Sequence, residues 1–142
     1  MTLLDAALVL YRRGWLAMPL EQDANGFPKR PIVSGWTGLE RTEAVIRSLP
    51  WERAKGLGIV LGAASSCLAC LDVDDTELPW AMLDALGYET RHLPRAVRTI
   101  RRRGHIYVQE LDGPSPSTRF AVRWRDREIT IELKAAGTQV AA

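Results

Sequence analysis

Three acids follow an apolar run in the segment CLACLDVDD (67–75), and two of them have the spacing of a metal site. Asp72 and Asp74 lie two residues apart, so on a strand both carboxylates project from the same face. Neighbouring carboxylates repel one another unless a positive charge lies between them. Mg²⁺ or Mn²⁺ meets that need, because both ions prefer oxygen ligands. The alternative is a solvated strand end whose acids cap the next helix, a role that suits Asp75.

A third acid, Glu132, comes from a separate part of the chain, in a hairpin whose expected turn is Asp126–Arg127. That register places Glu132 on the polar face opposite Ala121, whose small side chain leaves room beside the carboxylate. Metal-dependent phosphoryl transfer typically takes carboxylates from more than one strand. Asp72, Asp74 and Glu132 are therefore the candidate metal ligands. The alternative is an exposed Glu that pairs with a cross-strand Arg.

A basic segment, RTIRRRGHIYVQ (98–109), can bind the phosphates that accompany a metal ion. On a strand, Arg101, Arg103 and His105 share one face. Arginine is a bidentate phosphate donor, and histidine can hydrogen-bond a phosphate or donate a proton. His105 can equally be an ordinary hydrogen-bonded residue at the start of a strand. Lys29 lies in a second basic and aromatic cluster, which can contact phosphate or serve only as a proline-braced loop.

The charges of the chain are segregated along the sequence. Its 142 residues are 46% hydrophobic and 25% charged, the size and composition of one globular domain, and its net charge is only +2. Residues 72–89 contain six acids and no Lys or Arg, whereas 91–103 contain six arginines and no acid. An acidic patch beside a basic one suits a metal ion and phosphates, although two solvated faces would have the same composition. No apolar stretch is long enough to span a membrane and the N-terminus lacks a signal-peptide pattern, so we expect a cytoplasmic protein.

Short helices and strands must position these groups. The hydrophobic periodicity predicts helices at 3–13, 42–49 and 77–86, and strands at 15–20, 56–62, 67–74, 96–102, 104–109, 119–125 and 128–134. Residues 21–38, rich in Gly and Pro, are expected to form a long loop. Helices come mostly from the first half and strands from the second. This pattern predicts an α+β fold, a mixed or antiparallel sheet with flanking helices, in a single domain over 1–142.

Taken in order, these segments resemble the N-terminal domain of bifunctional DNA primase/polymerases, in the archaeo-eukaryotic primase superfamily. The resemblance is carried by ALVLYRRGWLAMPL, FPKRPIVSGWT, GLGIVLG with CLACLDVDD, RTIRRRGHIYV and ITIELKAAGTQVAA. It covers nearly the whole chain and implies a primase-like fold with an RRM-like catalytic core. The family continues into a Pro-Pro-Ser segment where this chain stops, so we expect a domain truncated at its C-terminus.

The resemblance implies a template-dependent nucleotidyltransferase that uses Mg²⁺ or Mn²⁺ for attack of a 3′-hydroxyl on an α-phosphate. It assigns the metal ions to Asp72, Asp74 and Glu132, and nucleotide or template contacts to His105 and Lys29. Arg103 stands where the family has a small residue, and either adds a phosphate contact or blocks the nucleotide. The implied partners are single-stranded DNA, ribo- or deoxynucleoside triphosphates and a replicative helicase. A catalytically weak nucleic-acid-binding module and a metal-dependent nuclease remain as alternatives.

Overall fold

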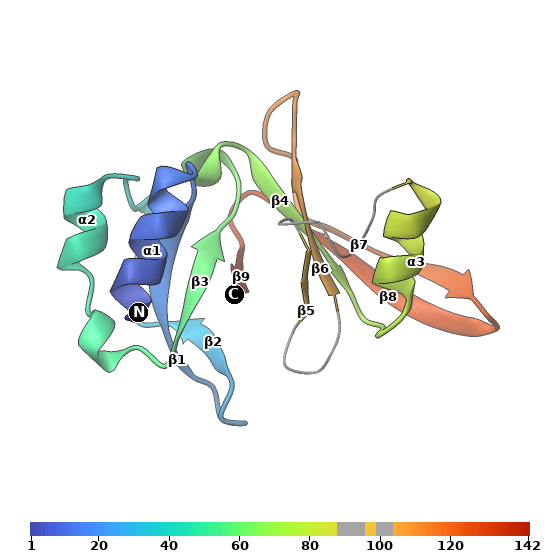
Figure 1. The fold of residues 1–142 in the computed structure, drawn as a ribbon, viewed down its shortest axis with the longest axis horizontal. Helices are drawn as coiled ribbons and strands as arrows, with labels where there is room; N and C mark the ends of the chain where they lie inside the picture. The colour runs from blue at the N-terminus through green and yellow to red at the C-terminus, as the bar shows by residue number, and fades with distance from the viewer. Residues whose placement is uncertain (88–95, 99–103) are drawn as a thin grey trace.

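The computed structural model describes residues 1–87, 96–98 and 104–142, with the backbone alone at 96–98. In these residues the strands form two antiparallel sheets, one from the first half of the chain and its end, the other from the second half (Figure 1). The predicted α+β class is confirmed, although two sheets stand where one was expected. None of the described helices is long and apolar enough to cross a membrane.

The first sheet has the strand order β2-β1-β3-β9 and carries two helices on its outer side (Figure 1). Its elements are α1 (Leu3–Arg12), β1 (Leu16–Gln22), β2 (Pro28–Pro31), α2 (Glu43–Ser48), β3 (Gly56–Val60) and β9 (Gln139–Ala141). The first five residues of β1 are all buried, because helices cover one face and the second half of the chain lies toward the other. This burial explains why the segment reads as a continuous apolar run.

A threonine caps each α-helix of the first half. The Thr2 hydroxyl accepts a hydrogen bond from the Asp5 amide at 3.1 Å, and the Asp5 carboxylate accepts one from the Thr2 amide at 2.8 Å. This reciprocal pair is a capping box, which satisfies two amides that the helix leaves free. Thr42 caps α2 in the simpler way, through its hydroxyl and the Val45 amide at 3.2 Å. Gly14, at φ 87°, ends α1 in a conformation that favours glycine.

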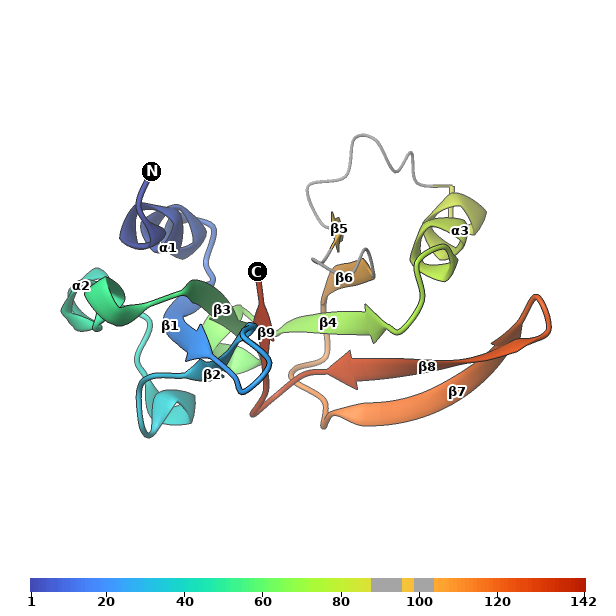
Figure 2. The same ribbon diagram turned by 90° about the horizontal axis from the view of Figure 1, so that it is seen from below.

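The second sheet has the strand order β5-β6-β4-β8-β7, so β4 is its central strand (Figure 2). Its elements are β4 (Leu68–Val73), α3 (Leu78–Ala85), β5 (Ala96–Arg98), β6 (Gly104–Gln109), β7 (Thr118–Trp124) and β8 (Arg127–Lys134). One face packs on α3 through the buried residues Val73, Leu78, Ile129 and Ile131. The other face looks toward the first sheet, since Cys70 and Tyr107 belong to the core shared with the first half.

The register predicted for the β7–β8 hairpin is wrong by two residues. The turn is Arg125–Asp126, not Asp126–Arg127, and both of its residues have positive φ, 48° and 59°, as in a type I′ turn. A two-residue shift keeps each side chain on its predicted face, so Glu132 stays on the polar one. Its cross-strand neighbour changes, however. Arg119 lies opposite Glu132, where Ala121 was expected.

Gly104 gives a stability prediction for the contact between β6 and α3. A Cβ at this position would lie 2.5 Å from Pro79 Cβ and 2.6 Å from Pro79 Cγ, which is closer than atoms pack. We expect Gly104→Ala to lower the free energy of unfolding by about 1–3 kcal/mol, measured by urea denaturation. Gly38→Ala is the matched control, because no atom lies within 4 Å of its added methyl group. Equal losses in the two variants would contradict the prediction.

Candidate active site

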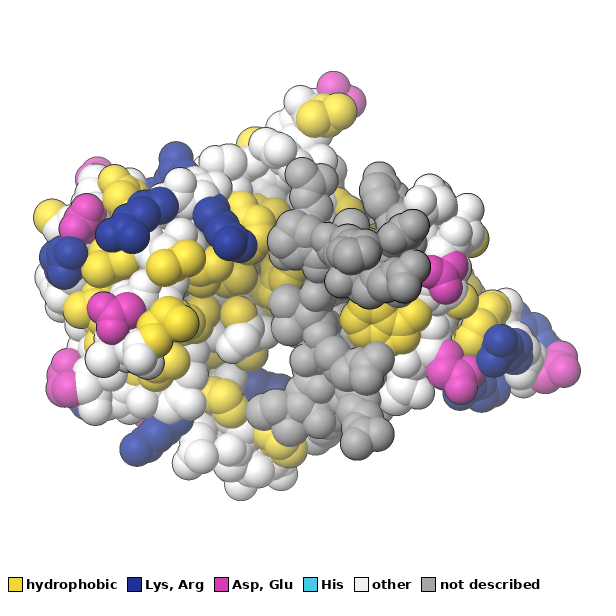
Figure 3. Space-filling model, in the orientation of Figure 1, with side chains coloured by type: hydrophobic (Ala, Val, Ile, Leu, Met, Phe, Trp, Pro, Cys, Tyr) yellow, Lys and Arg dark blue, Asp and Glu magenta, His cyan; other side chains and the backbone are white. Residues whose placement is uncertain are grey.

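The central strand β4 joins an acid, a histidine and a second acid in one row. Asp72 lies opposite His105 on β6 and opposite Glu132 on β8. Directly opposed residues of antiparallel strands project from the same face, so all three side chains share the face that carries Cys70 and Tyr107. That face looks toward the first sheet, and Figure 3 shows the molecule hollowed between its two halves. The row therefore lies in the cleft between the halves.

Asp72 is held by two basic groups. Lys134 Nζ lies 2.7 Å from Asp72 Oδ2, and His105 Nε2 lies 3.5 Å from Asp72 Oδ1. The lysine contact is the closer, since 3.5 Å is long for a hydrogen bond. The imidazole of His105 and the ammonium of Lys134 hold the pKa of Asp72 well below its ordinary value, against the opposing effect of burial. Asp72 is thus an anion with its charge already balanced.

Glu132 is also paired with a base. Arg119 Nη2 donates to Glu132 Oε2 at 3.2 Å, and the arginine side chain is 70% exposed. This contact is the alternative that the sequence left open for Glu132, namely a Glu that pairs with a cross-strand Arg. Such exposed pairs contribute only about 0–1 kcal/mol. Glu132 can therefore leave Arg119 at little cost when another cation is offered.

Asp74 and Asp75 leave the strand in different directions. Asp74 is exposed just beyond β4, where its amide donates to the Thr130 carbonyl at 3.0 Å and continues the pairing with β8. Asp75 is buried, and its Oδ1 accepts hydrogen bonds from the Glu77 and Leu78 amides at 2.8 Å each. The predicted role of Asp75 at the start of the helix is confirmed. Asp74 therefore lies next to the row along the chain, just beyond the end of β4.

The donor chemistry of the row fits a divalent cation, because carboxylates and an imidazole come together on neighbouring strands. In the present side-chain arrangement, however, the described residues contain no group of three or more His, Cys, Asp or Glu side chains that could hold a metal ion. The ammonium of Lys134 stands in for a cation at Asp72, and the guanidinium of Arg119 does so at Glu132. A metal ion at this row would have to displace both of these cations.

The remaining predicted site residues are Lys29, Arg101 and Arg103. Lys29 is on β2, an edge strand of the first sheet, where its Nζ lies 5.7 Å from the centre of the Phe27 ring and its carbonyl accepts from Gln139. No ion pair joins Lys29 to an acid of the row in the part of the chain that the structure describes. Arg101 and Arg103 lie outside the described residues, so their predicted place beside His105 remains a prediction.

Sequence reasoning missed Lys134 and Arg119. Lys134 follows Glu132 by two residues on one strand, the same spacing that pointed to Asp72 and Asp74, so the alternation of side chains could have found it. Arg119 depended on the hairpin register. A further feature appears only in three dimensions, since His105 is buried and its Nδ1 has no hydrogen-bond partner among the described residues.

The lowered pKa of Asp72 makes the stability of the metal-free protein depend on pH. A carboxyl with a lowered folded pKa stabilises the fold above its unfolded pKa, about 3.9, and this contribution is lost as the pH falls toward the folded value. We therefore expect wild type to lose more stability than Asp72→Asn as the pH falls from 5 to 2, roughly the range over which a carboxyl with a strongly lowered pKa loses its stabilising charge. Urea denaturation in EDTA at several pH values measures this. Parallel curves would show that Asp72 does not titrate abnormally.

Comparison with known protein families shows which family the chain matches. Residues 7–142 match the family described as bifunctional DNA primase/polymerase, N-terminal. No curated protein matches the chain. The matched segment includes both sheets and the whole Asp72–His105–Glu132 row. The chain belongs to the bifunctional DNA primase/polymerase N-terminal family.

Proposed function

We propose that residues 1–142 form a single catalytic domain that adds nucleotides to DNA on a single-stranded template, as a primase, a polymerase or both. The observation that carries this function is the row of Asp72, His105 and Glu132 on the cleft face of the second sheet. Family membership supports the same class of reaction. Single-stranded DNA and nucleoside triphosphates are the substrates, a replicative helicase is the expected partner, and the cytoplasm is the expected location.

Asp72, Asp74 and Glu132 would hold the Mg²⁺ or Mn²⁺. When bound, the metal lowers the pKa of an attacking 3′-hydroxyl and neutralises charge on the departing pyrophosphate. The chain's own residues supply the rest. The Asp72 carboxylate faces His105 Nε2, so it helps to orient the imidazole toward the phosphates of a nucleotide. Donation from His105 Nδ1, the buried nitrogen that lacks a described partner, to a phosphate oxygen would require the imidazolium form, which carries a proton on both nitrogens.

Lys134 and Arg119 have a second use in this function. Each neutralises an acid of the row in the free protein. If a metal ion were bound by these acids, Lys134 and Arg119 would be free to bind the oxygens of a triphosphate. Arg101, Arg103 and Lys29 would extend the same basic surface toward the nucleotide or the template.

Primer extension tests the proposal. The protein is mixed with a primed single-stranded template, labelled ribo- or deoxynucleoside triphosphates, and Mg²⁺ or Mn²⁺. Extension by wild type supports the proposal, and its absence under every combination contradicts it. Unprimed template in a parallel reaction separates priming from extension alone. Cleavage of the template without added nucleotide would identify a nuclease instead.

One observation favours a second candidate, a nucleic-acid-binding module of the same fold. Both Asp72 and Glu132 are already neutralised by basic side chains, as they would be in a site that has lost its metal. Binding of labelled single-stranded DNA, without any extension and without a response to Mn²⁺, would support this candidate.

A further inference from the structure

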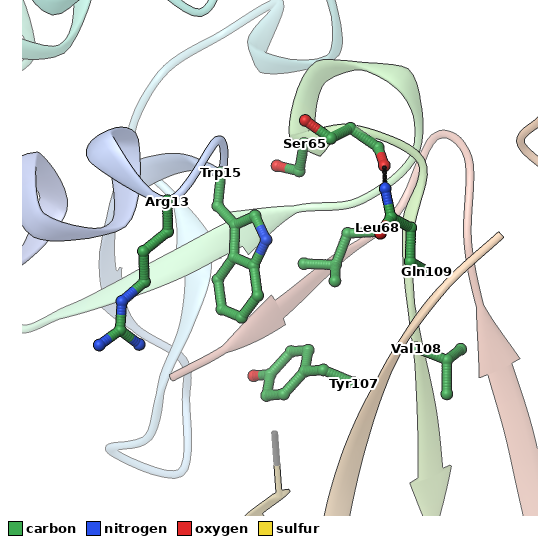
Figure 4. A pocket seen from close by; sticks show the side chains of 8 residues that line it. Arg13, Trp15, Ser65, Leu68, Tyr107, Val108 and Gln109 are labelled. Carbon is green, nitrogen blue, oxygen red and sulfur yellow. Dashed lines mark hydrogen bonds between the residues drawn. The ribbon is translucent and has the colours of Figure 1, made fainter. Parts of the chain in front are cut away.

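A pocket opens in the cleft at the end of β6 that lies away from α3 (Figure 4). Its volume is about 320 Å³, within the range of small-molecule sites. The lining includes Arg13, Trp15, Ser66, Leu68, Tyr107 and Gln109. These residues come from both halves of the chain: the end of α1, the connection into β4, and β6. The pocket exists only because the two halves are brought together.

The walls of the pocket are aromatic and flat. The rings of Trp15 and Tyr107 lie side by side, with centroids 5.6 Å apart and planes inclined by 32° (Figure 4). Leu68 adds an aliphatic surface beside them. A planar heteroaromatic group can lie against such walls by stacking, at about 1–3 kcal/mol per base in single-strand binding proteins.

The Tyr107 hydroxyl is the polar group of these walls that lacks a partner. Tyr107 is only 4% exposed, and its Oη makes no hydrogen bond to any residue that the structure describes. Burial raises the pKa of this hydroxyl, so it stays protonated and can both donate and accept. A buried hydroxyl without a partner is costly, and a ligand would satisfy it after the surrounding side chains move, because the oxygen is closed to solvent in the present arrangement.

The rim of the pocket is polar and carries a positive charge. Arg13 lies on one side and Gln109 on the other (Figure 4). Arg13 forms no ion pair with a described residue, whereas the Gln109 amide donates to the Ser66 carbonyl at 3.2 Å. An unpaired guanidinium at the mouth of an aromatic pocket suits a planar group that carries an anion.

The pocket lies near the row, because Tyr107 of its lining is close to His105. Tyr107 lies two residues from His105 on β6 and on the same face, with ring centroids 6.3 Å apart. Two residues of a strand span about 7 Å. A ligand of nucleotide length can therefore touch the pocket and approach the row.

We infer that this pocket binds a nucleobase, which lies against Trp15 and Tyr107 while its phosphate pairs with Arg13. This inference rests on the proposed function for the nature of the ligand, a nucleotide, but not for catalysis. A lipid tail would form no hydrogen bond or ion pair with Arg13, Gln109 or the Tyr107 hydroxyl. The same chemistry is offered by a free nucleotide and by one unit of single-stranded DNA, and the two sources are separable by experiment.

The test measures binding in EDTA, so that the proposed metal site contributes nothing. The full chain is titrated with dAMP, with an oligomer of dT and with 2-deoxyribose 5-phosphate, which lacks a base. We expect Tyr107→Phe and Arg13→Gln each to weaken dAMP or oligomer binding by about 3- to 10-fold. Arg12→Gln, a neighbouring exposed arginine outside the pocket, should leave binding unchanged. Circular dichroism checks that each variant is folded.

Each possible result of the titrations supports or overturns the inference that the pocket binds a nucleobase. Binding of dAMP alone identifies a pocket for a free nucleotide, and binding of the oligomer alone identifies a site for single-stranded DNA. Competition between the two ligands identifies a pocket that binds both. All three outcomes support the inference. Binding of the base-free sugar phosphate as tightly as dAMP overturns it, as do unchanged affinities in Tyr107→Phe and Arg13→Gln. Base binding without any primer extension would contradict only the proposed function. Extension without base binding would contradict only the pocket.

Discussion

Asp72→Asn should reduce the rate of nucleotide addition by roughly 100-fold or more, the scale of losing a group that acts on charge in the transition state. Asp72 is the central member of the row, opposed by His105 on one strand and by Glu132 on the other. Asparagine keeps the shape but removes the negative charge that a metal ion requires. Primer extension with Mg²⁺ and with Mn²⁺, at equal protein concentration, measures the loss.

Asp84→Asn is the matched control for this experiment. Asp84 is an exposed acid of α3, on the helix that covers the opposite face of the second sheet. Its replacement removes the same charge and should leave the extension rate unchanged. If Asp72→Asn keeps full activity while it remains folded, the proposed metal site is wrong. An equal loss in both variants would point instead to a general effect of net charge.

Lys134→Met should change two affinities in opposite directions. The Lys134 ammonium lies 2.7 Å from Asp72 and both side chains are partly buried, 23% and 27% exposed. Without Lys134, a metal ion no longer has to displace an ammonium from the carboxylate. Mn²⁺ should therefore bind about 10-fold more tightly, which corresponds to about 1.4 kcal/mol. Nucleotide affinity in saturating Mn²⁺ should fall by about 10-fold, because a phosphate contact is lost.

Two further substitutions keep this prediction falsifiable. Lys134→Arg retains a cation beside Asp72 and should keep Mn²⁺ affinity low. Lys55→Met removes an exposed lysine outside the row and should affect neither affinity. Electron paramagnetic resonance of free Mn²⁺ reports metal binding without any catalysis. If Lys134→Met leaves Mn²⁺ affinity unchanged, Lys134 does not compete with the metal, and a fall in both affinities would indicate a structural role.

The sequence predicted those helix starts and strand bounds that depend on contacts between residues close together along the chain. Thr2 and Thr42 cap the helices that were expected after them, and Asp75 accepts the amides at the start of α3. Strand β6 (Gly104–Gln109) has the predicted bounds, because an apolar alternation follows a glycine. In each case the decisive contacts lie within a few residues along the chain, where sequence patterns carry information.

Edge strands and registers were harder to predict. Strand β2 (Pro28–Pro31) begins and ends with proline and contains two exposed bases, so its sequence looks like a loop. Proline is tolerated there because the strand lies at the edge of its sheet. In the β7–β8 hairpin, the guanidinium of Arg125 lies 4.4 Å from the centre of the Trp124 ring, a contact that accompanies the observed turn and is invisible in the hydrophobic pattern.

The faces of the site residues were predictable, but their partners were not. Alternation along the strand kept Glu132 on the predicted face of its hairpin, whereas the shared face of Asp72 and Asp74 stays a prediction, because Asp74 lies beyond the end of β4. The pairing of Asp72 with both His105 and Glu132 joins segments about 30 and 60 residues away, and no local pattern fixes such a pairing. The ion pairs with Lys134 and Arg119 follow from that pairing and from the hairpin register.

The path of the chain between the two sheets bears on how the domain forms. The chain leaves the first sheet after β3, builds the second, and returns to add β9 beside β3, where Ile59 pairs with Val140. The first sheet is therefore incomplete until the segment Gln139–Ala141 has been synthesised. Contacts between segments so distant in sequence slow folding, since the intervening chain must be closed before they form. Assembly of the first sheet is thus coupled to that of the second, because every strand of the second sheet lies between β3 and β9 in the sequence.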